Sequence, residues 1–344
     1  MKRLFIFISL LLLNVLTSAQ TGTLIVLNKS DNNASLIDLA TKTVIATIPT
    51  GVAPHEVAVS PDGTLAVVSN YGGKEPGNSL TVIDIPALRK REDLDLDEYK
   101  RPHGIAWLKD GKRVAVTSEA SKALLLVDVG SGSVIRAIET RSDLSHMVAL
   151  TPDNSRAFVA NIGSGTITAI DLREQKWSLN LATGAGSEGI AVSPDGREVW
   201  VASRQADTVS VVNADKLKVV ATLESKSFPI RVKFTPDGRY VLVSHARSGD
   251  VTVYDAKSRK EVHRIKMELS PVSDADKRVL GNQFGASPAP IGILIPPDGQ
   301  RAYVANSNAD TVAVIDLKEW KIVDQIKTSK EPDGMGYSKL VLAK

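Results

Sequence analysis

Three of the five histidines in this 344-residue chain occupy the same place in three similar phrases. His55 stands in APHEVAVS, His103 in RPHGIAW and His146 in LSHMVALT, and two further phrases carry Glu188 and Asp333 there. Neutral imidazoles are ligands for Zn, Cu, Fe or Ni, and three of them with a carboxylate can leave a coordination position open for water or substrate. These five residues therefore predict a metal site, provided that the fold brings them together.

Two other interpretations fit the same pattern. The five side chains would also suit a metal-free site for a small polar ligand, or a solvated polar rim that binds nothing. Ile230 and Ile291 occupy the equivalent place in the other two phrases, so around the ring five neighbouring copies are polar and two are apolar. Random placement of three out of five histidines at one repeat position is improbable, which favours a binding site over a rim.

Neighbouring residues are candidates for further roles. Arg231 follows Ile230 and could neutralise an anionic ligand or cofactor, or form a salt bridge with a neighbouring repeat. His245 is a second candidate for cofactor binding, although its place at a strand end also suits a turn residue. Glu56 and Glu188 are candidate proton carriers, because a carboxylate beside a metal or a polarised carbonyl can act as a general acid or base. The pattern leaves the catalytic residues themselves unknown.

A repeated turn defines the elements that must position these residues. Proline presets the first dihedral angle of the turn, and glycine or asparagine tolerates the left-handed one, so each copy predicts a hairpin. The Pro-Asp-Gly turn or a close variant of it occurs at 61–63, 109–111, 152–154, 194–196, 236–238 and 297–299.

Fixed spacings follow each turn. Seven residues after the turn Gly or Asn stands Asn, Ser or His, and eighteen residues after the turn Asp stands Asp or Asn in five copies. Short, mainly apolar runs lie between these marks, which predicts strands, and no sustained helical period occurs. Four antiparallel strands in a repeat of about 42 to 48 residues are typical of a β-propeller blade.

The repeats add up to seven blades. Six complete four-strand units begin near His55, His103, His146, Glu188, Ile230 and Ile291. Residues 23–48 supply three strands without the first, and residues 331–338 supply a first strand alone. We therefore predict one all-β domain over residues 21–344, a seven-bladed β-propeller whose N- and C-terminal strands share a blade and close the ring. Because the first strand is innermost, its first residues should meet at one mouth of the central channel.

The repeat resembles that of a known family. SPDGREVWVAS, TPDGRYVLVSH and PPDGQRAYVANSNADTVAVID are similar to the YVTN-type repeat of the YncE-like exported β-propellers, and the resemblance covers nearly the whole mature chain. That family is similar in outline to the lactonase propellers and to haem-d1 propeller domains. The resemblance implies the fold and export and permits single-stranded DNA binding, but it defines no substrate because the shared phrase is structural.

Residues 1–19 predict a secretory signal peptide. Lys2 and Arg3 precede an apolar run that ends near Leu16 and is too short to span a membrane, and small residues follow up to Ala19. We expect cleavage near Ala19, a periplasmic or secreted location and no membrane span afterwards. The sequence contains no cysteine, which excludes disulfides, thiolate metal ligands and covalent haem.

Charge and composition narrow the partners and the function. The net charge is +3 and aromatic residues make up 5%, which disfavours nucleic acid because a single-strand site needs a basic groove lined with aromatics. We expect a monomer that binds a small polar ligand or an exported partner protein, with a transition-metal ion (Zn, Cu, Fe or Mn) as cofactor. The predicted function is a binding module at the histidine-rich mouth. The alternative is a metal-dependent hydrolase or isomerase of the lactonase type.

Three departures from the regular repeat should elaborate this mouth. They are extra residues after Asn70, a charged connection at 89–102 and an insertion at 267–290. Long loops gathered on one face of a repeat fold usually mark the binding face, although neutral variation in loop length gives the same pattern.

Overall fold

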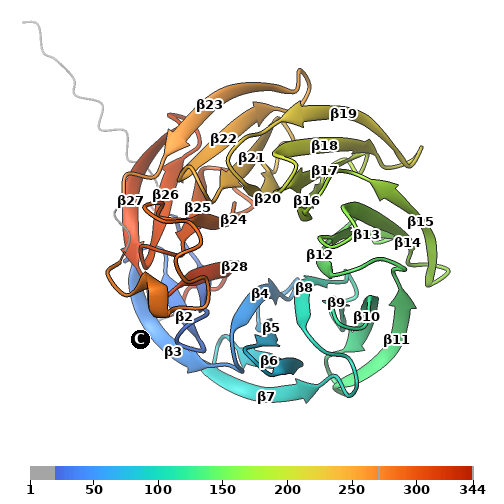
Figure 1. The fold of residues 1–344 in the computed structure, drawn as a ribbon. Coiled ribbons are helices and arrows are strands. Elements are labelled where there is room, and N and C mark those ends of the chain that lie inside the picture. The colour runs from blue at the N-terminus through green and yellow to red at the C-terminus, as the bar shows by residue number, and fades with distance from the viewer. Residues whose placement is uncertain (1–19, 270–271, 343–344) are drawn as a thin grey trace, which may run out of the picture.

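The computed structural model describes residues 20–269 and 272–342, which form seven four-stranded antiparallel sheets around a central channel (Figure 1). The predicted all-β, seven-bladed fold is therefore confirmed. The predicted signal peptide, residues 1–19, lies outside the described residues. Within the described ranges, no helix has the length and apolarity needed to cross a bilayer, and the one short helix is η1 (Ala275–Lys277).

Each blade runs from an inner strand at the channel to an outer strand at the rim. In this order the strands are β4 (Pro54–Val59), β5 (Leu65–Gly72), β6 (Pro76–Asp84) and β7 (Arg89–Asp95) in blade 1; β8 (Pro102–Trp107), β9 (Arg113–Ser118), β10 (Ala123–Asp128) and β11 (Ser133–Glu139) in blade 2; β12 (Ser145–Leu150), β13 (Arg156–Asn161), β14 (Thr166–Asp171) and β15 (Lys176–Ala182) in blade 3; β16 (Ser187–Val192), β17 (Glu198–Ser203), β18 (Thr208–Asn213) and β19 (Lys218–Glu224) in blade 4; β20 (Pro229–Phe234), β21 (Tyr240–His245), β22 (Asp250–Asp255) and β23 (Lys260–Lys266) in blade 5; β24 (Pro290–Leu294), β25 (Arg301–Asn306), β26 (Thr311–Asp316) and β27 (Lys321–Lys327) in blade 6; and β28 (Pro332–Ser338), β1 (Thr23–Asn28), β2 (Asn33–Asp38) and β3 (Thr43–Pro49) in blade 7.

Blade 7 joins the two ends of the chain. The C-terminal strand β28 pairs antiparallel with β1, and Ile25 lies opposite Gly336 in this pairing. The Thr23 hydroxyl also donates a hydrogen bond of 2.8 Å to the Leu340 carbonyl. Because the last strand completes the sheet begun by the first three, the ring closes without an unpaired inner strand.

The repeated turn is held by its aspartate. In blade 4, Asp195 Oδ1 accepts hydrogen bonds from Ser193 Oγ (2.6 Å) and from the backbone nitrogen of Arg197 (3.0 Å). Asp237 accepts the equivalent two bonds in blade 5. Gly196 has a φ of 76°, in the left-handed region that glycine adopts without strain. The turn fixes the register of the two inner strands, so it sets where each inner strand starts.

Apolar side chains fill the space between neighbouring blades. Leu124 and Leu126 of β10 pack in one cluster with Val148 and Val159 of blade 3. A sheet inside the ring has a neighbouring blade on each side, so both faces of its middle strands are buried. This burial explains the nearly continuous apolar runs of those strands.

Two glycines bring the inner strands close together at the channel. A Cβ atom on Gly104 would lie 2.6 Å from the carbonyl oxygen of His146, and one on Gly292 would lie 2.1 Å from that of Asp333. Any side chain at these two positions would overlap the backbone of the next blade. The close approach places the first residues of adjacent inner strands side by side.

The departures from the repeat have different structures. The extra residues after Asn70 lengthen the β5–β6 hairpin. The stretch 89–102 was expected to be a connection, but Arg89–Asp95 forms the regular outer strand β7. The charges that suggested a loop lie on a strand that is largely exposed at the rim of the ring.

The insertion at 267–290 reaches the predicted mouth. It contains η1, which lies over the blade that the two ends share (Figure 1). The backbone nitrogens of Val279 and Leu280 donate hydrogen bonds to the carboxylate of Glu331, at 3.0 and 2.6 Å, and fasten the insertion to the start of β28.

Candidate functional site

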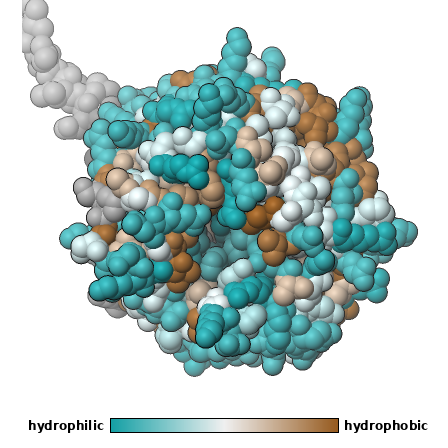
Figure 2. All heavy atoms as spheres, in the orientation of Figure 1, coloured by the Kyte–Doolittle hydropathy of each residue, from teal (hydrophilic) through white to brown (hydrophobic). Residues whose placement is uncertain are grey.

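One cavity of about 260 Å³ lies at the mouth of the channel. We call the residues at the start of the seven inner strands the first ring, and all of them line this cavity: His55, His103, His146, Glu188, Ile230, Ile291 and Asp333. Figure 2 shows a hollow near the centre of the ring, on the face that Figure 1 presents. The fold thus brings together the five polar residues that the repeat spacing singled out.

Hydroxyl groups of the second strands hold the first ring in place. Ser69 Oγ donates a hydrogen bond of 2.6 Å to the carbonyl oxygen of His103 in the next blade. Thr117 Oγ1 makes the equivalent bond, also 2.6 Å, to the carbonyl oxygen of His146. These bonds tie β8 and β12 to the preceding blades, so the imidazoles of His103 and His146 extend from a fixed backbone.

A second ring, which the sequence analysis missed, surrounds the first. Its members directly follow the Asn or Ser position near the end of each second strand, and those that line the cavity are Lys29, Tyr71, Glu119, Ile162 and Arg204. The same spacing that located the first ring marks this position too. A search for charged residues at every fixed repeat position would have found it.

Glu188 is the centre of a charge network. It accepts hydrogen bonds from Arg204 Nη1 at 2.5 Å and from Arg231 Nη1 at 2.9 Å, and it lies 3.4 Å from His146 Nε2. Burial raises the pKa of Glu188, but the hydrogen bond from His146 and the charges of both arginines lower it far more, to well below the usual range. Such a firmly ionised carboxylate is poorly suited to carry a proton.

His146 is held between two carboxylates. Its Nδ1 donates to Glu119, and its Nε2 faces Glu188. Burial lowers the pKa of His146, but the hydrogen bonds and charges of the two carboxylates outweigh burial and raise it. Because carboxylates engage both ring nitrogens, neither is free to bind a metal ion in this arrangement.

His55 and His103 are neutral. Burial, reinforced by Lys29, lowers the pKa of His55 to about 4. Burial and the charge of His146 lower the pKa of His103 well below its ordinary value. His55 Nδ1 donates a 2.8 Å hydrogen bond to the Ala53 carbonyl, so its Nε2 keeps a lone pair.

Two of the three imidazoles at the mouth, those of His55 and His103, are therefore neutral and have no carboxylate partner among the described residues. The ring centroids of His55 and His103 are 4.9 Å apart, and the rings of His103 and His146 face each other at 3.5 Å. In the part of the chain that the structure describes, no group of three His, Asp or Glu side chains has the geometry to hold a metal ion. The transition-metal site stays a prediction, and a metal would first have to displace His146 from its carboxylates.

Arg231 crosses the channel below the first ring. Its Nη2 donates to Glu56 Oε1 at 2.7 Å, which joins blade 5 to blade 1. Burial lowers the pKa of Arg231, but nearby carboxylates raise it overall, so the side chain keeps its charge. For Glu56 burial outweighs the attraction of Arg231 and raises the pKa. We call this pair the Arg231–Glu56 bar. Its raised pKa makes Glu56 the better suited of the two candidate proton carriers, although only Glu188 of the two lines the mouth cavity.

Three buried polar atoms at the mouth have no hydrogen-bond partner among the described residues: His103 Nδ1, Asp333 Oδ1 and Arg204 Nε. Asp333 Oδ2 is paired with Lys29 Nζ at 3.1 Å, whereas Arg231 comes only within 4.0 Å of Oδ1. Burial raises the pKa of Asp333, but Lys29 and Arg231 lower it overall, so Asp333 is ionised. Buried groups without partners call for an explanation, because nearly all such groups in native proteins are satisfied.

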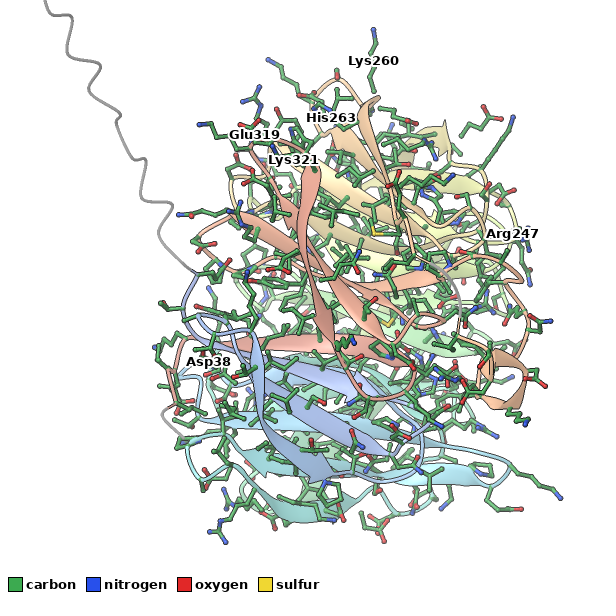
Figure 3. The ribbon with its side chains drawn as sticks, turned by 90° about the vertical axis from the view of Figure 1, so that its left-hand side faces the viewer. Asp38, Arg247, Lys260, His263, Glu319 and Lys321 are labelled. Atoms are coloured by element: carbon green, nitrogen blue, oxygen red, sulfur yellow. The ribbon has the colours of Figure 1, made fainter. Side chains whose placement is uncertain are left out.

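The two remaining histidines lie elsewhere. His245, a candidate for cofactor binding, is fully buried in blade 5, where its Nε2 and Ser225 Oγ are hydrogen-bonded at 2.9 Å and its Nδ1 lies 3.2 Å from Asp250. It does not line the mouth cavity. His263 lies on the outermost strand β23 and stacks on Trp320, away from the channel (Figure 3).

Comparison with known proteins bears on the fold. A family model described as "YNCE-like beta-propeller" matches residues 148–277. The resemblance to YncE-like propellers is thereby confirmed. No curated protein matches the chain.

Solved structures share the architecture at low identity. Hydrazine synthase of Kuenenia stuttgartiensis is 20% identical with a TM-score of 0.67, covering 82% of this chain and 88% of that one. A functionally unknown protein from Desulfotomaculum acetoxidans DSM 771 is 13% identical with a TM-score of 0.75, covering 92% and 99%. Dihydro-heme d1 dehydrogenase NirN, in complex with DHE, is 19% identical with a TM-score of 0.64, covering 90% and 64%. Likeness at this level shows the fold alone.

Proposed function

We propose that this protein is an exported binding module that holds a small polar ligand at the mouth of its channel. The observation that carries the proposal is that three residues of the cavity lining, His103, Asp333 and Arg204, each hold a buried polar atom without a partner among the described residues. A ligand in the cavity would supply the missing hydrogen bonds. A rim that binds nothing would leave these groups buried at a cost in free energy.

The lining favours a zwitterionic ligand with an apolar part. Ionised Asp333 can only accept hydrogen bonds, and Arg204 can only donate them, so the ligand needs both a donor and an acceptor. Ile230, Ile291 and Phe284 form an apolar wall from blades 5 and 6 and the insertion. An apolar amino acid has this combination of groups and suits a cavity of about 260 Å³.

The alternative is a metal-dependent hydrolase or isomerase at the same mouth. It is favoured by the lone pair on His55 Nε2, which the hydrogen bond from Nδ1 to Ala53 leaves available in the arrangement typical of metal-ligating histidines. His55 and His103 would hold the ion, which would polarise a carbonyl group or activate water. Glu56, with its raised pKa, would carry the proton.

Calorimetric titration with three matched probes tests the proposal. L-leucine carries both charged groups, isovalerate lacks the amine and isoamylamine lacks the carboxylate. We expect saturable 1:1 binding of leucine only, weakened about tenfold in D333N because one charge-assisted hydrogen bond is lost. The surface variant D215N, at an aspartate that is largely exposed, is the control and should bind as the wild type does.

Two results would contradict the proposal. One is the absence of saturable heat with leucine, and the other is equal affinity of the wild type and D333N. Metal content by mass spectrometry, followed by titration with Zn²⁺, decides on the alternative. Stoichiometric Zn²⁺ binding that is lost in H55A and kept in H263A would favour the metal-dependent enzyme.

A further inference from the structure

A second cavity of about 390 Å³ occupies the channel on the far side of the Arg231–Glu56 bar. Arg231 lines both this cavity and the mouth cavity, so the bar separates them. The second cavity extends to Pro194 and Pro236 of the repeated turns, at the opposite end of the inner strands. We call it the lower channel.

The lower channel presents apolar and polar surface in similar amounts. Its aliphatic, aromatic and thioether side chains are contributed by inner strands all around the ring: Val57, Ile105, Met147, Val148, Leu150, Ile190, Val192, Val232, Phe234, Ile293 and Met335. Its volume is in the range of pockets that hold small organic ligands. In such pockets apolar side chains bury the body of the ligand, and polar groups orient it.

Lys233 is the charged residue of this lining that does not belong to the Arg231–Glu56 bar. It lies three residues after Ile230 of the first ring and opposite Leu242 in the sheet. The equivalent positions of the other six blades carry Ala58, Ala106, Ala149, Ala191, Leu294 and Gly336. Five of these six are alanine or glycine, and three of them, Ala106, Ala149 and Ala191, line the lower channel together with Lys233.

Lys233 is not part of the Arg231–Glu56 bar and has no charged partner among the described residues. Among the described residues it forms no salt bridge with an Asp or Glu side chain, because the nearby carboxylate of Glu56 is taken by Arg231. Lys233 remains accessible to solvent, yet the channel wall surrounds it, and the resulting loss of hydration lowers its pKa. An anion beside Lys233 would supply the counter-charge that the wall does not provide.

We propose that the lower channel binds a small organic carboxylate, with its apolar body against the aliphatic wall and its carboxylate on Lys233 Nζ. A carboxylate is the group that the lone lysine can recognise, and an apolar body is what the wall can bury. The site is distinct from the mouth and does not depend on the function proposed for the mouth. It also gives a physical reason for a lysine at a position where the repeat otherwise carries small or aliphatic residues.

Calorimetric titration of the full mature protein with hexanoate, hexanamide and hexylamine tests this site. The three probes share one apolar chain and differ in the charge of the head group. We expect hexanoate to bind at least about tenfold more tightly than hexanamide, and hexylamine to bind most weakly, because only the carboxylate forms a charge-assisted hydrogen bond with Lys233.

Two variants locate the binding. K233M keeps an unbranched side chain of similar length but removes the charge, and it should weaken hexanoate about tenfold while leaving hexanamide unchanged. K218M removes an exposed lysine from the outer strand β19 and serves as the matched control. A149L narrows the bore without touching a charge and should weaken both hexanoate and hexanamide.

The proposal is overturned if hexanoate binds the wild type and K233M equally, or if hexylamine binds as well as hexanoate. It is also overturned if hexanoate and the larger octanoate both show no saturable heat at millimolar concentration. Thermal unfolding of each variant without ligand shows whether it is folded. Leucine binding, measured in parallel, reports on the mouth alone, so failure of one site is distinguishable from failure of the other.

Discussion

The two ends of each inner strand follow opposite rules. At the turn end, copy after copy presents an aspartate that accepts the same backbone hydrogen bond, as Asp195 and Asp237 do. At the mouth end, the blades present three histidines, two carboxylates and two isoleucines. A feature repeated in every blade has a structural role in the fold. A feature that changes from blade to blade has a role at one particular site. Arg231 and Lys233 are departures of the second kind, and both lie in the channel.

Among the variants at the mouth end of the inner strands, removing the charge of Arg231 should lower the free energy of unfolding most. R231M leaves Glu56 and Glu188 buried beside each other without their shared partner, and breaking a buried ion pair from one side costs about 3 to 5 kcal/mol. The control is R197M, at a turn arginine that is 79% exposed in blade 4, which should stay within about 0.5 kcal/mol of the wild type. Urea unfolding measures both, and similar losses for the two would break the contrast between the ends.

As the pH falls, the buried histidines of the mouth should lower the free energy of unfolding before the aspartates of the turns do. His55 in the unfolded chain binds a proton near pH 6.5, but in the folded protein only near pH 4. The unfolded state therefore holds more protons between these values, and this residue alone removes up to about 3 kcal/mol of stability as the pH falls from 6.5 to 4. His103, whose pKa is also lowered, acts in the same direction.

His146 acts in a different pH window because its pKa is raised. Its contribution is complete below about pH 6.5 and is lost as the pH rises through its value in the folded protein. The free energy of unfolding, measured against pH for the wild type and H55Q, separates these effects. The variant should fall less steeply between pH 6.5 and 4, and identical slopes would show that His55 does not titrate as its burial requires.

The smallest expected effects belong to the repeated turns. D195A and D237A each remove one acceptor of a backbone hydrogen bond, and each should cost about 1 kcal/mol. The two losses should agree within measurement error because the two turns have the same bonds. A difference well above 1 kcal/mol between them would mean that the two turns are not equivalent. It would contradict the inference that the turn end is structurally the same in every blade.

Much of the fold and half of the site could be predicted from the repeat. The turn signal, the spacing to the strand ends and the closing strand predicted at 331–338 indicated seven blades, because each depends on local chain geometry. The same register placed His55, His103 and His146 at one mouth. The error at 89–102 arose because a charged outer strand and a charged loop have the same composition.

The sequence by itself determined which residues meet at the mouth, since a periodic fold converts one position in the phrase into one ring in space. Only the tertiary structure decided which of them pair. Arg231 donates a hydrogen bond to Glu56, which is 175 residues away in the sequence. The ring nitrogens of His146 contact Glu119 and Glu188, so they are not free to bind a metal. The physical reason is that pairing and protonation depend on distances across the closed ring and on burial there, and no spacing along the chain encodes those distances.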